Sequence, residues 1–431
     1  MDTIQIRSEQ GLLEGEKKGE IMVFRGIPYA EAPIGENRFR APSHKKPWSG
    51  VRQAISFAPG CPGRKKDENS FYVKEFHGTE QYPDAGVNED CLYLNIWAPT
   101  EPGNYPVAVY LHGGSFERGS GAEIAFDGEK FAANGVILVT VNYRTGVFGF
   151  FADEALRRES PHRITGNYGI LDQIAALQWV WRNIHFFGGN ADHITLFGQS
   201  AGAISTQALV SSPLTEGLIH SAIMQSGGGL DNGVEAISME QALETGRQIK
   251  EHLGVTTIEE MRRLPAEKLV DVLDELPRKD MELKFGPALD NYILKESFGD
   301  ALRNGHVLDI PYMIGVTAND ISVGKDMDVR DSIIFKGCVN FCECRLKTSD
   351  KPVYLYNFAR RLPGDEAGAF HSAELWYVFG TLNRSWRPME RRDYSISYKM
   401  IENWTSFIKN DDPGKDWRSY DEEDQFVRQF M

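Results

Sequence analysis

The feature that most constrains this chain is the pentapeptide Gly198–Gly202, which has the form Gly-x-Ser-x-Gly. The apolar run His193–Gly198 is typical of a buried strand, and a helical pattern begins near Ala201. Where a strand turns directly into a helix, the two elements lie so close that glycine is needed on both sides of the turn. The residue at the apex, Ser200, is then expected to have a strained backbone and an exposed hydroxyl.

Apolar runs typical of strands alternate with helical patterns along most of the chain. This alternation indicates an α/β fold with a mostly parallel, twisted sheet and helices on both faces. Besides the strand before Ser200, we expect strands at residues 105–112, 136–143, 222–225, 311–315 and 353–356, and a helix between Gly169 and Ile184. The first 30 or so residues predict an antiparallel hairpin at one edge of the sheet. Because no repeat or long linker interrupts the chain, residues 1–431 are expected to form a single domain.

A second glycine-rich segment, His112–Phe116, follows directly after the predicted strand that ends at Leu111. Acyl transfer needs backbone N–H donors at the position where the oxyanion forms. A His-Gly-Gly segment after a strand can supply them from Gly114 and Ser115, and Ala201 adds the N–H that follows the nucleophile. Taken alone, the segment would equally suit a structural turn. Together the two motifs predict the α/β-hydrolase fold, with Ser200 as the nucleophile.

The acid and the base follow from the order of residues along the chain. In this fold the serine comes first, then Asp or Glu, then histidine. Asp320 lies just beyond the predicted strand 311–315, and His371 is the one histidine after it. Asp290 and Glu374 are alternative acids, but Asp290 follows a poorly defined strand and Glu374 shares the segment of His371. We therefore predict a triad of Ser200, Asp320 and His371.

Composition excludes several classes of function. The net charge of −14 argues against a nucleic-acid surface and favours neutral or cationic ligands. No apolar run approaches the roughly 18 residues of a membrane-spanning helix. The start of the chain lacks a signal-peptide pattern, which predicts a cytoplasmic protein or a secreted one whose signal was removed. Cys338, Cys342 and Cys344 lack neighbouring ligands, so we predict no metal and no cofactor.

Several further segments carry a resemblance to a known family. The chain resembles the type B carboxylesterases, which include bacterial para-nitrobenzyl esterases and the cholinesterases. The matching segments run almost from end to end: Phe24–Ala30, Asn37–Arg40, Glu89–Trp97, Val141–Arg144, Gly166–Gln173, Phe187–Asn190, Gln225–Gly227 and Gly368–His371. The resemblance implies a serine carboxylesterase of α/β-hydrolase fold with the triad and oxyanion hole named above.

The resemblance also implies roles for residues outside the triad. It implies two structural ion pairs, Arg38 with Glu89 and Arg144 with Asp172. Breaking one partner of such a buried pair should cost several kcal/mol. It further implies that the Ser226 hydroxyl lies near the triad acid. Cys61 and Cys91 match the family's first disulfide pair, although bond formation depends on the compartment.

Three positions depart from the family pattern. Gln199 replaces the usual Glu before the nucleophile, which removes a negative charge beside the imidazole. Ser115 replaces the usual third glycine of the oxyanion loop, and Asp320 is one methylene shorter than the commoner Glu. The segment from Asp320 to His371 is also shorter than usual, so the resemblance does not predict the shape of the substrate pocket.

The substrate is the least constrained part of the interpretation. The cholinesterases of the family resemble each other in a Trp within the loop closed by the first cysteine pair. The segment between Cys61 and Cys91 has no Trp, so the resemblance does not imply a choline-selective enzyme. By resemblance the pocket involves Phe116, Met281 and Leu283, which suit esters of small or medium acyl groups. We expect a monomer or weak homo-oligomer that acts on small-molecule esters. The alternatives are a feruloyl-type or lipase-like esterase, and a non-catalytic interaction domain.

Overall fold

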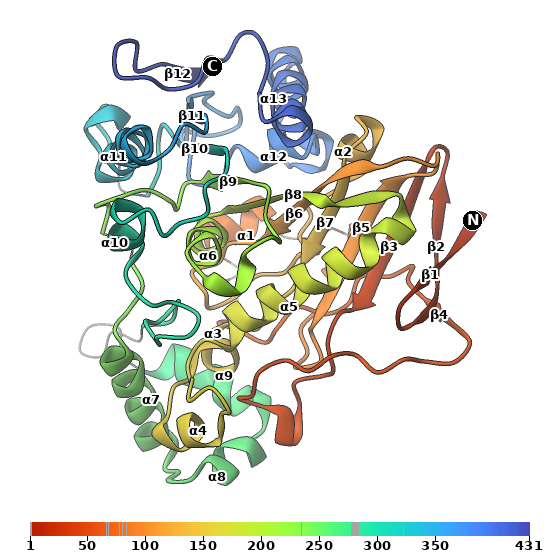
Figure 1. The fold of residues 1–431 in the computed structure, drawn as a ribbon, viewed down its shortest axis with the longest axis vertical. Helices are drawn as coiled ribbons and strands as arrows, with labels where there is room; N and C mark the ends of the chain where they lie inside the picture. Colours follow the sequence, from red (N-terminus) through yellow and green to blue (C-terminus); the bar gives the residue numbers. More distant parts are fainter. Residues whose placement is uncertain are drawn as a thin grey trace.

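The structure is a computed structural model that describes residues 2–65, 67, 69–76, 78–79, 81–82, 84–233, 235–276, 284–321 and 323–431. Within these residues twelve strands form one sheet, with the order β1-β2-β3-β5-β7-β6-β8-β9-β10-β11-β12 and β4 beside β2 (Figure 1). Their bounds are β1 Asp2–Ser8, β2 Gly11–Lys18, β3 Ile21–Pro28, β4 Val51–Gln53, β5 Tyr93–Pro99, β6 Tyr105–Leu111, β7 Ile137–Val141, β8 Gly189–Gln199, β9 Ser221–Gln225, β10 Tyr312–Thr317, β11 Val353–Phe358 and β12 Val427–Phe430.

The sheet has a parallel part and an antiparallel part. From β7 through β6, β8, β9, β10 and β11 to β12, every neighbouring pair is parallel. The N-terminal strands β1, β2, β3 and β5 pair in antiparallel fashion and join the parallel part at β7. The predicted mostly parallel sheet with an antiparallel N-terminal edge is therefore confirmed.

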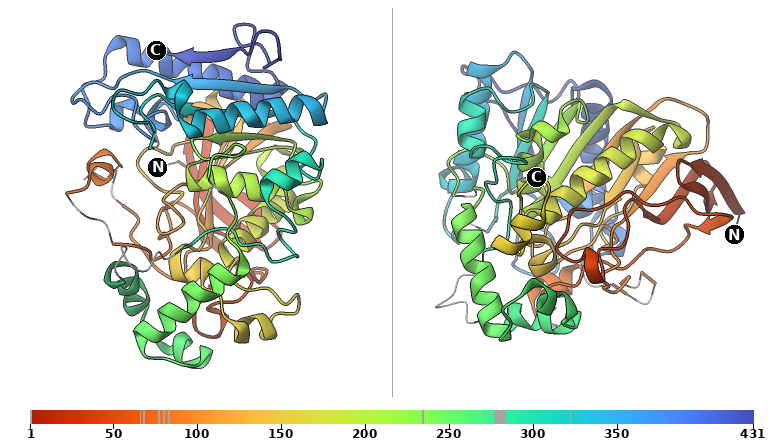
Figure 2. Two further views of the ribbon diagram at one scale, coloured as in Figure 1. Left: turned by 90° about the vertical axis from the view of Figure 1, so that its left-hand side faces the viewer. Right: turned by 60° about the horizontal axis from the view of Figure 1, so that its bottom comes forward.

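Helices cover both faces of the sheet, and further helices gather at one end. On one face lie α3 Gly146–Phe150, α5 Tyr168–Asn183, α6 Ala201–Val210, α10 Phe298–Arg303 and α11 Ile333–Thr348. On the other lie α2 Glu129–Ala133, α12 Leu375–Val378 and α13 Arg391–Asn410. The helices α7 Met239–Leu253, α8 Ile258–Arg263 and α9 Ala266–Glu275 group with α4 Glu154–Glu159 at the end of the molecule opposite α11 and α13 (Figure 2). A short helix, α1 Phe71–Phe76, lies in the segment between β4 and β5.

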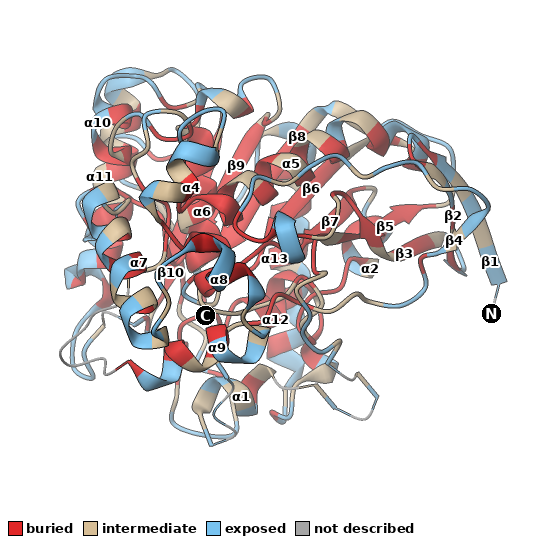
Figure 3. Ribbon diagram, turned by 90° about the horizontal axis from the view of Figure 1, so that it is seen from below, coloured by how far each residue is buried: buried red, intermediate tan, exposed pale blue. Residues whose placement is uncertain are grey.

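The central strands are buried because helices cover both of their faces. Successive residues of a strand point to opposite sides of a sheet. In β6, Val107, Val109 and Leu111 accordingly belong to the core under α5 and α6. Ala108 and Tyr110 belong to the core under α12 and α13. Figure 3 shows this burial along β6, β8 and β9.

All six strands expected from apolar runs are present, with ends that differ by a few residues. The largest difference is at β8, which begins at Gly189 rather than at His193. The strands β5 and β12 were not among those predicted. The short β12 pairs only with β11 at the edge of the sheet, so its sequence carries a weak signal.

The two ion pairs implied by the resemblance are confirmed. Arg144 donates from Nε and Nη2 to the two carboxylate oxygens of Asp172, both at 2.7 Å, and both side chains are buried. Arg38 holds Glu89 through Nε at 2.7 Å and also donates to the backbone carbonyl of Leu264 just after α8, at 2.7 Å. The second pair therefore connects the N-terminal region to the helices at the end of the molecule.

The five cysteines are all free thiols in the structure. Cys61 and Cys91 are both buried, and the Cys91 thiol lies beside Cys61. That hydrogen-bonding contact, together with burial, raises the pKa of Cys91. The disulfide implied by the resemblance is thus not formed here, although its two partners are neighbours.

We expect Asp172→Asn to lower the free energy of unfolding by about 3–5 kcal/mol, because the Arg144 guanidinium would keep its burial and lose its counter-charge. Equilibrium urea denaturation of the variant and the wild type measures this difference. Glu244→Gln is the matched control, since its partner Arg247 lies at an exposed site and should contribute less than about 1 kcal/mol. A loss for Asp172→Asn no larger than that of the control would contradict the account.

Candidate active site

Ser200 lies at the turn between β8 and α6, with a φ of 56° and a ψ of −125°. Few residues with a side chain adopt such a backbone conformation, which stores strain at the turn. The flanking glycines permit it by allowing close contact. A Cβ added at Gly202 would lie 2.0 Å from the carbonyl oxygen of Leu111, and one at Gly198 would lie 2.3 Å from the backbone of Gly202. Ser200 is fixed further by its N–H, which donates to the carbonyl of Gln225 at 2.9 Å.

The glycine-rich loop after β6 lies against this turn. A Cβ added at Gly113 would lie 3.0 Å from the Cβ of Ser200. Gly114 has a φ of 108° and Ser115 a φ of 57°, so the loop uses the left-handed region at both expected oxyanion donors. At Gly114 glycine is required, because a Cβ there would lie 2.2 Å from the carbonyl oxygen of Arg118. Ser115 accepts the same strain with a side chain.

A buried contact between Tyr143 and His112, which the sequence did not predict, supports the glycine-rich loop after β6. The Tyr143 hydroxyl donates to the carbonyl of His112 at 2.7 Å, and the two rings stack with centroids 4.2 Å apart. Burial lowers the pKa of His112 to about 4, so this ring is neutral at physiological pH. Tyr143 lies in one of the segments that carry the family resemblance, but nothing in its sequence context names its partner.

Asp320 and His371 are in direct contact. The Nδ1 of His371 donates to Oδ1 of Asp320 at 2.6 Å, and both side chains are buried. The carboxylate is fixed in a tight turn after β10, where its Oδ2 accepts from the N–H and the hydroxyl of Thr317 at 3.1 and 3.0 Å. This turn brings the backbone close to the ring, which explains how the shorter Asp reaches it. The N–H of Ile321 donates to Oδ1 at 2.8 Å.

The two alternative carboxylates lie elsewhere. Asp290 caps a turn, where it accepts from Asn167 and from backbone N–H groups of residues 292–294. Glu374 is completely buried, with one oxygen receiving a 3.4 Å hydrogen bond from Gln225 and the other lacking any partner among the described residues. Burial first, and then the charge of Asp320, raise the pKa of Glu374 to about 7.

The charges around His371 determine when it is neutral. Burial alone would lower its pKa, but the hydrogen bond and charge of Asp320 and the charge of Glu374 outweigh burial and raise it above the ordinary value. Burial would likewise raise the pKa of Asp320, and its contact with His371 overcomes this and lowers it. Ser226, which was expected near the acid, also helps to lower the pKa of Asp320.

Gln199 contacts the imidazole directly. Because Nδ1 of His371 carries the proton donated to Asp320, its Nε2 is the acceptor, and the Gln199 amide donates to it at 3.2 Å. Among the described side chains no hydrogen bond joins Ser200 to His371. From the sequence, Gln199 was expected only to remove a negative charge. In the structure its side-chain amide is also hydrogen-bonded to Nε2 of His371.

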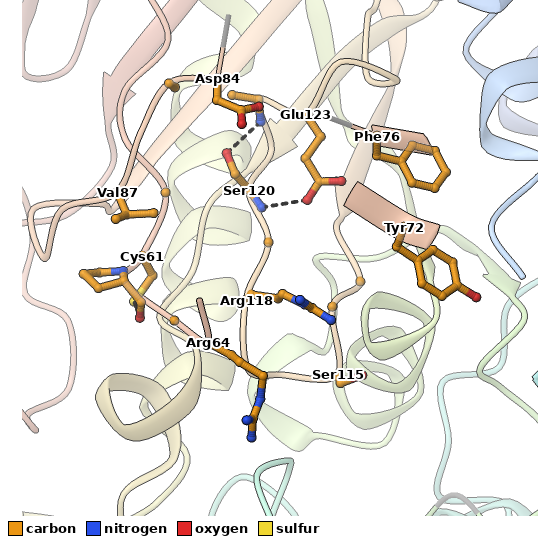
Figure 4. A pocket seen from close by; sticks show the side chains of 18 of the residues that line it. Cys61, Arg64, Tyr72, Phe76, Asp84, Val87, Ser115, Arg118, Ser120 and Glu123 are labelled. Carbon is orange, nitrogen blue, oxygen red and sulfur yellow. Dashed lines mark hydrogen bonds between the residues drawn. The ribbon is translucent and has the colours of Figure 1, made fainter. Parts of the chain in front are cut away.

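These groups open onto a pocket of about 810 Å³ (Figure 4). Its walls include Gly113, Gly114, Ser115, Gln199, Ser200 and His371, together with the aromatic side chains of Tyr72, Phe76 and Phe126. The structure corrects the expectation for Phe116, which is not among the residues that line this pocket. Its φ of 58° turns the side chain into the core, where its ring packs against Phe150. Met281 and Leu283 lie outside the described residues.

One other group of ionisable side chains could hold a metal ion. Among the described residues, His193, His220 and Asp411 bring potential ligand atoms within 4.8 Å of one another. The Nε2 of His193 already donates to the carbonyl of Ile408 at 2.7 Å, and none of the three residues lines the pocket beside Ser200. In the described part of the chain, no helix is long and apolar enough to cross a membrane.

Proteins of known family resemble this chain over nearly its whole length. The model of the carboxylesterase family matches residues 2–343 and 329–430. The chain belongs to the carboxylesterase family. It is 31% identical over 476 residues to the para-nitrobenzyl esterase of Bacillus subtilis, covering 97% of this chain and 93% of that protein. A solved PNB esterase superposes with a TM-score of 0.87 at 30% identity and covers 99% of this chain and 95% of its own. This carboxylesterase therefore hydrolyses carboxylic esters.

A second relative is more similar over a shorter region. The fumonisin B1 esterase of Sphingopyxis macrogoltabida is 38% identical over 323 residues. The match covers 73% of this carboxylesterase and 55% of that protein.

We expect Gln199→Glu to move the rising limb of the activity profile to higher pH by about one pH unit or more. A carboxylate at this contact favours the imidazolium, and the base must be neutral to accept a proton, so activity at pH 7 should fall. The profile of kcat/KM between pH 5 and 9 measures the midpoint. Gln199→Met is the control for loss of the hydrogen bond without added charge. If the midpoint of the pH profile were the same in the Glu and Met variants, residue 199 would not contact the general base, and the role of His371 would be contradicted.

Proposed function

We propose that this carboxylesterase acts through an acyl-enzyme intermediate formed on Ser200, with His371 as general base and Asp320 as the acid of the triad. The observation that carries the proposal is the 2.6 Å hydrogen bond between His371 and Asp320 at the pocket that Ser200 lines. An aspartate in this contact fixes the tautomer in which Nε2 is free to accept a proton, and it stabilises the imidazolium that forms.

The reaction then follows from these roles. Ser200 Oγ attacks the ester carbonyl carbon while its proton passes to Nε2 of His371. The N–H groups of Gly114, Ser115 and Ala201 receive the developing oxyanion. His371 then gives the proton to the leaving alcohol as the ester C–O bond breaks, which leaves the acyl group on Ser200. Water attacks the acyl carbon while His371 takes its proton, and the bond to Ser200 Oγ breaks as His371 returns that proton to the serine and the carboxylic acid leaves. Because Gln199 donates to Nε2 in the free enzyme, its amide must move aside as Ser200 approaches the ring.

For the substrate, we propose esters of small or medium acyl groups. The pocket of about 810 Å³ and its aromatic walls support this range. A feruloyl-type or lipase-like specificity is the alternative. Graded chain lengths of 4-nitrophenyl esters test the lipase-like alternative, and 4-nitrophenyl ferulate tests the feruloyl-type one. Activity that increases up to long acyl chains would favour the lipase-like alternative. We also propose that residues 1–431 act as one catalytic domain.

We expect Ser200→Ala to remove hydrolysis of 4-nitrophenyl butyrate by several orders of magnitude, since no covalent intermediate can form. Asp320→Asn should lower kcat by as much as ~10⁴ with its fold retained, because the wrong tautomer of His371 is then favoured. Initial rates together with thermal unfolding midpoints test both variants. Asp290→Asn is the matched control and should retain turnover. Turnover in Asp320→Asn close to that of the control would overturn the triad.

A further inference from the structure

Among the cations of the pocket that the structure describes, Arg118 makes no ion pair with a described side chain. Among the described pocket residues, Arg64 pairs with Glu117 at 2.6 Å and Asp274 at 3.1 Å, and Lys65 pairs with Asp271 at 2.6 Å. In the described part of the chain, the guanidinium of Arg118 makes no such ion pair or hydrogen bond with another side chain. A guanidinium presents several N–H donors in a fixed plane, and its natural partner is a carboxylate.

Arg118 is held beside the oxyanion loop by its own backbone. Its N–H donates to the carbonyl of Gly114 at 3.2 Å. Its Cγ would lie 3.4 Å from a Cβ added at Gly114, so the side chain starts in contact with one of the proposed oxyanion donors. From there it extends toward the side of the pocket that carries Tyr72 (Figure 4). Arg118 therefore lines the same pocket as Gly114 and Ser200.

The acidic residues of the pocket are mostly engaged elsewhere. Glu89 is bound by Arg38, and Glu123 accepts from the N–H of Ser120 at 3.2 Å. Asp84 has a partner of its own. Glu267 is the remaining carboxylate in the described lining, and it is exposed in the first turn of α9. Arg118, which follows the proposed oxyanion donors Gly114 and Ser115 in the chain, is thus available to bind a ligand.

We propose that Arg118 binds a carboxylate on the acyl part of the substrate, so that this carboxylesterase favours monoesters of dicarboxylic acids. The inference rests on the proposed function, because it needs the acyl group beside Gly114. The net charge of −14 does not prevent such binding, since charges more than about 8 Å away are largely screened at physiological ionic strength. Tyr72 lines the same pocket and provides a second donor, since a tyrosine hydroxyl keeps its proton at neutral pH and partial burial raises its pKa further, to about 12.

The test compares two esters of the same shape. Monoethyl glutarate carries the second carboxylate, and ethyl 5-amino-5-oxopentanoate replaces it with a neutral amide. Ethanol release gives kcat/KM for each, and the ratio of the two values cancels any general loss of activity. Arg118→Met should lower this ratio about ten- to a hundredfold, the range expected for a hydrogen bond to a charged group. Arg118→Lys should restore part of it, because the charge returns without the planar fork.

Lys65→Met is the matched control, since Lys65 lies at the rim and already pairs with Asp271, and its ratio should change less than about twofold. A ratio that Arg118→Met leaves unchanged would overturn the inference. Efficient hydrolysis of the amide ester with exclusion of the glutarate would do the same, while leaving the proposed function intact. A second pair, 4-(butyryloxy)benzoate and 4-(butyryloxy)benzamide, places the charge on the alcohol. If only that pair responds to Arg118→Met, the acyl-side assignment is wrong. If none of the four esters is hydrolysed, the proposed function itself fails.

Discussion

The close approach of α6 to the ends of β6 and β8 is the constraint on which the rest of the site depends. Gly202 packs against the carbonyl of Leu111 with no room for a Cβ, and this close contact permits the sharp turn at Ser200. The same contact sets the glycine-rich loop after β6 beside the serine. Because β6, β8 and β10 are parallel, their carboxyl ends lie at one edge of the sheet, and Asp320 reaches the site from there.

Two buried carboxylates, Asp320 and Glu374, supply negative charge around His371. The usual Glu before the nucleophile is Gln199, which contacts the ring without a charge. Glu374 is buried near the Asp320–His371 pair, and burial together with the charge of Asp320 raises its pKa to about 7. As Glu374 becomes charged, it favours the imidazolium and so raises the pKa of His371. The pH dependence of this carboxylesterase should therefore reflect two linked groups rather than a single histidine.

Much of this arrangement could be predicted from the sequence, and the exceptions have physical reasons. The buried strands and the turn at Ser200 were predictable because apolar runs and paired glycines are local signals. Asp320 was predicted from chain order together with its position just after the strand 311–315. The direction of Phe116 depends on the sign of its φ, which the glycine-rich pattern before it does not specify. The contacts of Gln199 with His371 and of Tyr143 with His112 join segments far apart in the chain, so no local pattern could reveal them.

In the proposed mechanism a single serine, activated by His371, forms the covalent intermediate. A fluorophosphonate probe traps that serine, and mass spectrometry locates the adduct. We expect one adduct per chain, located on Ser200 and formed in step with the loss of esterase activity. An adduct on another serine, or full inactivation without any adduct on Ser200, would contradict it.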